Sequence, residues 1–198
     1  MKAWVYDWGG LNVVLFHAVN ANHAPWLDRI MLALTWSADH NRFPAYLAAL
    51  ALAAWWRFAL DPASPPARVW VLALATFSIG YLLDGVLVLG LKEAFDFPRP
   101  PAVFPADGLV VVGTAEFHHS LPSGHASFAA LVAASLWPMT RSVTGRIALA
   151  LFVVLVDLSR PYLGLHFPAD VVFGSLKSLL VVVAVRAALT KWMPAARR

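Results

Sequence analysis

Apolar blocks with the length of membrane-spanning helices dominate this chain. A helix needs about 20 apolar residues to cross the hydrocarbon core of a bilayer. Segments such as 69–91 are apolar on every side, which is typical of lipid-embedded helices and differs from the alternation of a strand barrel. The sequence therefore predicts an all-α, polytopic membrane protein, one domain over residues 1–198, with six transmembrane helices at about 24–38, 43–60, 69–91, 123–139, 145–160 and 166–190.

Composition excludes several classes of protein. Of the 198 residues, 60% are hydrophobic and 13% are charged, whereas soluble domains average about 45–50% apolar and about 25% charged residues. The sequence has no cysteine, which excludes a disulfide framework and thiolate zinc sites. The net charge of +4 comes from Lys and Arg scattered between apolar blocks, without a basic stripe, so no nucleic-acid partner is expected.

The chain ends and loops predict how the protein lies in the membrane. Asp7 and His17 interrupt the apolar run of the first 20 residues, which makes a poor cleavable signal peptide and predicts an N-terminal interfacial helix. Because about 15 residues barely span a bilayer, the block at 24–38 is the weakest of the six. With six crossings, both termini lie on one side, which the positive-inside rule makes cytoplasmic; its basic residues are Lys2, Arg57, Arg68, Arg141, Arg146, Lys191, Arg197 and Arg198.

Polar residues converge at the opposite, outward side, where the ends of four predicted helices meet. Charge near a bilayer is costly, so such a cluster predicts a functional site, although the ends of loops are also commonly polar because they are hydrated. The cluster is rich in cations and imidazoles and poor in carboxylates. Its members are Lys92, Arg99, His118, His119, Ser123, His125, Ser159, Arg160, His166 and Asp170.

Three cations from separate segments, Lys92, Arg99 and Arg160, predict a site for a compact polyanion. Guanidinium groups match phosphate oxygens in a bidentate geometry, which favours phosphate as the ligand. The run 122–125 opens a predicted helix, where backbone amides and the helix dipole bind anions. Ser123 adds a hydroxyl donor there, and Gly124 lets a ligand approach the backbone.

One histidine is a candidate nucleophile. His166 and Asp170 are four residues apart on one face of a predicted helix, so the carboxylate can orient the imidazole and stabilise its charged form. The same spacing also fits a simple hydrogen bond on a helix surface.

Three spaced motifs favour the catalytic interpretation: Lys92-x6-Arg99-Pro100, Pro122-Ser123-Gly124-His125 and Ser159-Arg160-x5-His166-x3-Asp170. Together they resemble the three-part signature of the type 2 phosphatidic acid phosphatase superfamily. The resemblance spans residues 92–170, and the run of predicted helices resembles the membrane branch of that superfamily rather than its soluble acid-phosphatase and vanadium-haloperoxidase relatives.

The resemblance implies a phosphatase that uses no metal and no cofactor. His166 would attack the phosphorus and form a phosphohistidine, Asp170 would hold its ring, and His125 would protonate the departing oxygen. The groups implied to bind the phosphate oxygens are Lys92, Arg99, Ser123, Gly124 and Arg160.

The implied substrate is a membrane lipid that carries a phosphate. The pattern at 15–20 and Pro25-Trp26 resembles small bacterial undecaprenyl-diphosphate phosphatases, which implies hydrolysis of undecaprenyl diphosphate to undecaprenyl phosphate on the outer face of the bacterial plasma membrane. Phosphatidylglycerophosphate, phosphatidate and lipid A are competing substrates for the same chemistry. A lipid or anion transporter is the alternative of another class; it predicts charges along a path through both leaflets, whereas these residues gather at one end.

Glu116, His118 and His119 lie outside the three motifs and are candidates for contact with the lipid headgroup. Imidazoles near their ordinary pKa of about 6.5 are protonatable donors for a second phosphate. A metal site formed by these residues with His125 is a rival interpretation. It is disfavoured because the side chains of adjacent residues such as His118 and His119 point apart in regular structure. We therefore expect the site to bind no metal.

Asp84, Asp157 and Lys177 lie inside apolar blocks, where each ionisable group needs a partner. We expect Lys177 to pair with one of the two aspartates. Such a pair either joins two helices or lines a cavity for the lipid.

Overall fold

The computed structural model describes residues 6–60, 65–105 and 108–192, and all regular structure in these ranges is helical. The helices that correspond to the six apolar blocks begin and end within a few residues of the predicted bounds, so the all-α prediction is confirmed. The elements are η1 (Trp8–Gly10), α2 (Leu11–Asn20), α3 (Pro25–Ser37), η2 (His40–Arg42), α4 (Phe43–Leu60), α5 (Pro65–Phe95), α6 (Pro100–Val103), α7 (Gly124–Leu136), α8 (Val143–Tyr162) and α9 (Pro168–Trp192).

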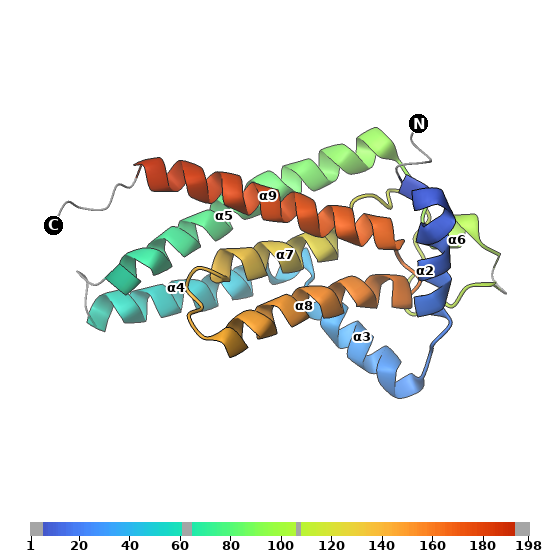
Figure 1. The fold of residues 1–198 in the computed structure, drawn as a ribbon, viewed down its shortest axis with the longest axis horizontal. Helices are drawn as coiled ribbons and strands as arrows, with labels where there is room; N and C mark the ends of the chain where they lie inside the picture. Colours follow the sequence, from blue (N-terminus) through green and yellow to red (C-terminus); the bar gives the residue numbers. More distant parts are fainter. Residues whose placement is uncertain (1–5, 61–64, 106–107, 193–198) are drawn as a thin grey trace.

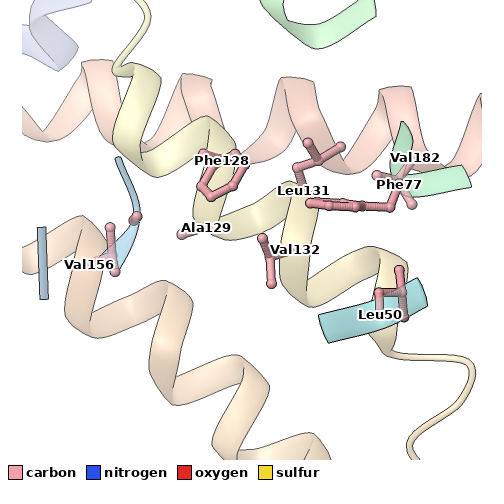
Figure 2. Close-up of a cluster of buried hydrophobic side chains, with 9 residues drawn as sticks. Leu50, Phe77, Phe128, Ala129, Leu131, Val132, Val156 and Val182 are labelled. Carbon is pink, nitrogen blue, oxygen red and sulfur yellow. The ribbon is translucent and has the colours of Figure 1, made fainter. Parts of the chain in front are cut away.

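Helices α4, α5, α7, α8 and α9 run along the long axis of the molecule, and α2 lies across one end of them (Figure 1). Helix α7 lies among the other long helices, and nine of its 13 residues are buried. Its small residues let neighbouring helices approach, while Phe128 and Leu131 fill the centre of the bundle. Figure 2 shows these two side chains with Leu50 of α4, Phe77 of α5 and Val182 of α9 in one apolar cluster.

The outer surface of the bundle is apolar. On α5, Leu82, Val86 and Leu89 are 66%, 70% and 68% exposed, and Leu180 of α9 is 69% exposed. Contiguous exposed apolar surface of this kind suits contact with lipid rather than with water. Among the described residues, three segments are long and apolar enough to cross a membrane: His40–Leu60, Val69–Val103 and Pro168–Lys191.

Helix α3 differs from the transmembrane helix predicted at 24–38. Its 13 residues rise about 20 Å, which is short of the roughly 30 Å hydrocarbon core. Side chains from both of its ends reach the last turn of α8: Asp28 accepts a hydrogen bond from Tyr162, and Thr35 accepts one from Arg160. The structure thus gives no support to a crossing by this block.

The described ends of the chain lie at opposite ends of the bundle. Tyr6 contacts Asp170 at the start of α9, whereas Lys191 lies at the other end of that helix (Figure 1). The expectation that both termini share one side is therefore wrong, because it depended on a crossing by α3. Lys2, Arg197 and Arg198, which entered the orientation argument, lie outside the described residues, as does the side chain of Arg68.

The three ionisable residues predicted inside apolar blocks, Asp84, Asp157 and Lys177, all have partners. Lys177 Nζ lies 2.7 Å from Asp84 Oδ1, so the pairing predicted for Lys177 is confirmed with the first of the two aspartates. Ser178 Oγ donates to the same oxygen of Asp84 over 2.5 Å. Asp157 instead accepts hydrogen bonds from Ser175. The ion pair joins α5 to α9, the two helices that lead to the polar end of the bundle.

Candidate active site

A cavity of about 530 Å³ lies at the end of the bundle where α5 and α8 end and α7 begins. Its two walls differ in chemistry. One wall comes from α5 and is mostly apolar, with Tyr81, Leu82, Gly85, Val86, Val88 and Leu89. The other is polar, with His40, Lys92, Arg99, Glu116, Gly124, His125, Arg160 and His166.

His166 is buried in the polar wall, in the short connection between α8 and α9. Its Nδ1 lies 3.4 Å from Asp170 Oδ2, and its Nε2 lies 3.3 Å from Arg99 Nη1. The carboxylate is the natural partner for a proton on Nδ1, which leaves the lone pair on Nε2, toward the arginine. Burial and the positive charge of Arg99 lower the pKa of His166 well below its usual value, so the ring is neutral and nucleophilic at neutral pH.

Asp170 is fully buried, and its two oxygens are held separately. Oδ2 accepts hydrogen bonds from Ser120 Oγ at 2.5 Å and from the Phe167 amide at 2.8 Å. Oδ1 accepts one from the Tyr6 hydroxyl at 2.8 Å, and burial next to this carboxylate raises the pKa of Tyr6, so the hydroxyl keeps its proton. These bonds fix the carboxylate that orients His166.

Arg99 is held rigidly at the start of α6. Its Nε donates to the carbonyl of His118, its Nη1 donates to that of Leu165, and its Nη2 forms a 2.6 Å ion pair with Glu116. Arg160, in the last turn of α8, is 4% exposed and donates through Nη1 to Thr35. Its Nε has no hydrogen-bond partner among the described residues. Both guanidinium groups, with Lys92, line the cavity as the sequence predicts.

The start of α7 forms the next part of the site. Ser123 caps the helix by accepting a hydrogen bond from the Ala126 amide, and its own amide donates to the Asp170 carbonyl. Its side chain is buried, and Gly124 is the residue that lines the cavity. A Cβ at Gly174 would lie 2.7 Å from the Ser123 carbonyl oxygen, so glycine is what lets α9 bring Asp170 to this turn.

His125 lines the cavity one residue further along α7. Its Nε2 lies 3.9 Å from Asp39 Oδ2, in the turn between α3 and α4. The same turn contributes His40 to the cavity wall, and a Cβ on Gly124 would lie 3.2 Å from the His40 ring. Thr35, Asp39 and His40 were not among the site residues predicted from the sequence. Ser120 and Tyr6 were missed too, because nothing in their local pattern indicates a partner far along the chain.

The three candidate headgroup residues separate in the structure. Glu116 lines the cavity through its contact with Arg99. His118 and His119 do not line it, and their Nδ1 atoms lie 3.7 Å and 3.2 Å from Asp96 Oδ1. The two adjacent rings approach one oxygen, although adjacent side chains were expected to point apart, because His119 has a left-handed backbone with φ of 56°. Among the described residues, no three His, Asp or Glu side chains are grouped closely enough to hold a metal ion.

This arrangement suits transfer of a phosphoryl group. A neutral imidazole with a buried carboxylate behind it is a nucleophile, and two arginines and a lysine around one cavity stabilise the oxygens of a phosphate. A second imidazole, His125, is available for proton transfer. The apolar wall on α5 provides a surface for a hydrocarbon chain next to the polar wall.

Comparisons with known proteins agree with this geometry. A family model described as the PAP2 superfamily matches residues 68–194. No curated protein matches the sequence. The crystal structure of Aquifex aeolicus LpxE is similar to this chain with 23% identity and a TM-score of 0.73, over 88% of this chain and 94% of that one.

A second similar structure is the crystal structure of the first transmembrane PAP2 type phosphatidylglycerolphosphate phosphatase from Bacillus subtilis. It is 22% identical, with a TM-score of 0.69, over 96% of this chain and 89% of that one. Both likenesses extend along most of the chain, so the fold is shared beyond the matched residues.

Proposed function

This chain belongs to the PAP2 superfamily, and we propose that it is a membrane lipid phosphatase that works through a phosphohistidine. The observation that carries the proposal is the environment of His166 Nε2, which faces Arg99 at 3.3 Å while Asp170 lies behind the ring. An imidazole held this way by a buried network is prepared for attack on an anion that the arginine binds.

In the first step, His166 Nε2 attacks the phosphorus and the bond from phosphorus to the lipid oxygen breaks. Arg99, Arg160 and Lys92 stabilise the charge on the other phosphate oxygens, as cations do in phosphoryl transfer. His125 gives its proton to the departing oxygen. The lipid leaves with that proton, and the phosphoryl group stays on His166.

In the second step, water attacks the phosphohistidine. His125, now neutral, takes a proton from the water while the bond between phosphorus and nitrogen breaks. Inorganic phosphate is released, and His166 regains its lone pair. Asp170 remains ionised throughout and stabilises the positive charge of the ring when His166 carries the phosphoryl group.

The substrate we propose is undecaprenyl diphosphate, which would lose its terminal phosphate. Leu82, Val86 and Leu89 line the cavity and are also exposed on the outer face of α5, so a prenyl chain can extend from the cavity into the surrounding lipid. Phosphatidylglycerophosphate is the second candidate, favoured by the similarity to the Bacillus subtilis enzyme.

We also propose that the cavity faces the outside of a bacterial plasma membrane. The basic residues at the end of the bundle away from the cavity are Arg57 in the last turn of α4, Arg141 and Arg146 beside the start of α8, and Lys191 in the last turn of α9. Figure 1 shows these helix ends opposite α2. The positive-inside rule assigns this end to the cytoplasm. This orientation is the same whether or not α3 crosses the membrane.

The test is phosphate release by the purified protein in detergent with EDTA present. The substrates are undecaprenyl diphosphate, phosphatidylglycerophosphate, phosphatidate and lipid A, and the variants are His166→Ala and Glu93→Gln. Glu93 is an exposed carboxylate on α5 that does not line the cavity. We expect release by the wild type and by Glu93→Gln, and a loss of at least about 1000-fold in His166→Ala, since it lacks the nucleophile.

Release that survives in His166→Ala would contradict the phosphohistidine. Movement of the lipid across the membrane of vesicles that contain the protein, without release of phosphate and unchanged in His166→Ala, would favour the transporter. The lipid with the highest kcat/KM identifies the substrate among the four.

A further inference from the structure

The turn between α3 and α4 carries a carboxylate that none of the three motifs contains. Asp39 begins this turn, and its Oδ1 accepts a hydrogen bond from the Asn41 amide at 2.7 Å. This bond fixes the orientation of the carboxylate. The other oxygen, Oδ2, then lies 3.9 Å from His125 Nε2 at the cavity.

The charges around His125 make this contact important. In the proposed reaction His125 must carry a proton before the lipid oxygen leaves. The cavity wall around it holds Lys92, Arg99 and Arg160, together with His40, and positive charges disfavour a protonated imidazole. A nearby carboxylate offsets them, because an opposite charge favours the protonated imidazole.

The other carboxylates of the site are engaged elsewhere. Glu116 forms its ion pair with Arg99, and Asp170 lies against His166 and is held by Ser120 and Tyr6. Among the described residues, Asp39 is the carboxylate that forms an ion-pair contact with His125.

We propose that Asp39 is a positioning residue for His125. Its Oδ2 orients the imidazole and stabilises the protonated ring, so that His125 can donate to the departing oxygen. The electron pair of the broken bond goes to that oxygen, the proton follows from His125, and Asp39 stays ionised. The site thus contains two pairs of histidine and aspartate, one for the nucleophile and one for the acid. This inference rests on the proposed function.

The variant Asp39→Asn separates this role from a purely structural one. Asn is as good a cap as Asp, because its side-chain oxygen accepts the same hydrogen bond from a backbone amide. The turn therefore keeps its bond to Asn41, while the negative charge facing His125 disappears. Asp39→Ser also keeps a capping oxygen but is too short to reach His125, so it serves as a second variant.

The experiment compares two soluble substrates, octyl phosphate and 4-nitrophenyl phosphate. The alkoxide of octanol is strongly basic and needs a proton as it leaves, whereas 4-nitrophenolate leaves without one. The ratio kcat/KM reports the steps up to departure of this group, so it is not affected by a slow second step. We expect both Asp39 variants to lose at least about tenfold in kcat/KM on octyl phosphate, a part of the 10²–10⁴-fold typical of acid catalysis, and less than about twofold on 4-nitrophenyl phosphate.

A double-mutant cycle with His125→Ala provides the second readout. If Asp39 acts through His125, Asp39→Asn has no further effect on octyl phosphate hydrolysis once His125 is absent. Glu93→Gln, which removes an exposed carboxylate outside the cavity, controls for the change in net charge.

Equal losses on both substrates, losses that multiply in the double variant, or no loss in Asp39→Asn would overturn the inference. These results differ from a failure of the proposed function. In that case the wild type hydrolyses neither substrate, or hydrolysis persists in His166→Ala.

Discussion

Replacing Lys177 by Met removes the cation that faces Asp84 across the contact between α5 and α9. The two side chains are 9% and 1% exposed, and the ion pair is 2.7 Å long. Ser178 continues to donate to Asp84 Oδ1, but Oδ2 already lacks a hydrogen-bond partner among the described residues. Loss of one partner from a buried pair costs about 3–5 kcal/mol.

For a chain of this size, each kcal/mol lowers the unfolding temperature by about 2–4 °C, so Lys177→Met should unfold about 6–20 °C below the wild type. The double variant Asp84→Leu/Lys177→Met should recover most of this loss, because it leaves no unpaired charge. Thermal unfolding in detergent measures both, with Lys191→Met, at the exposed end of α9, as the control.

A stabilising ion pair is contradicted if Lys177→Met unfolds at the same temperature as the wild type, or if the double variant is no more stable than Lys177→Met. Neither Asp84 nor Lys177 lines the cavity. Lipid hydrolysis by folded Lys177→Met at low temperature should therefore stay within about threefold of the wild type. A folded variant that has lost lipid turnover would instead favour a role in binding the lipid.

Two further predictions concern the pair formed by His166 and Asp170. Burial and nearby cations lower the pKa of His166, so its ring stays neutral below pH 6.5. On 4-nitrophenyl phosphate, whose leaving group needs no acid, kcat/KM corrected for ionisation of the substrate should hold as the pH falls to 6.5 and drop in more acid solution; an acid midpoint at or above 6.5 would contradict the neutral nucleophile. Ser120→Ala removes the 2.5 Å hydrogen bond to Asp170. Because a hydrogen bond to a charged group contributes about 1.5–3 kcal/mol, kcat should fall at least about tenfold while KM stays nearly constant. An unchanged kcat would show that the Phe167 amide and Tyr6 suffice to hold the carboxylate.

The helices of this protein could be predicted because each apolar block carries its own signal. The block at 69–91 became α5, Pro65–Phe95, since Lys92 and Glu93 continue a helix well although they are polar. The crossing predicted at 24–38 is not confirmed, and the reason is physical. A short apolar helix reads the same whether it crosses a membrane or packs across the end of a bundle, and only the contacts of Asp28 and Thr35 with α8 separate the two cases.

The part of the candidate site that could be predicted is the set of residues that the three motifs hold at fixed spacings along the sequence. Arg99, Arg160, His125 and His166 line one cavity as the motifs predict. Asp39 could not be selected from the sequence, because its proximity to His125 depends on how the turn after α3 returns to the start of α7. Motifs record residues with fixed neighbours along the chain, whereas supporting residues are chosen by the packing of distant elements.

The internal contacts of the arginines bear on the charge of the ligand. Arg99 is satisfied by carbonyl groups and by Glu116, whereas Arg160 has a buried Nε without a partner among the described residues. A ligand must therefore supply acceptors for Arg160 and replace or share Glu116 at Arg99. Glu116 offsets one of the three positive charges of Arg99, Arg160 and Lys92, so a phosphodiester, with one negative charge, leaves one positive charge uncompensated. A phosphomonoester or a terminal diphosphate carries about two, which offsets more of it, and this charge balance favours hydrolysis of terminal phosphates over phosphodiesters.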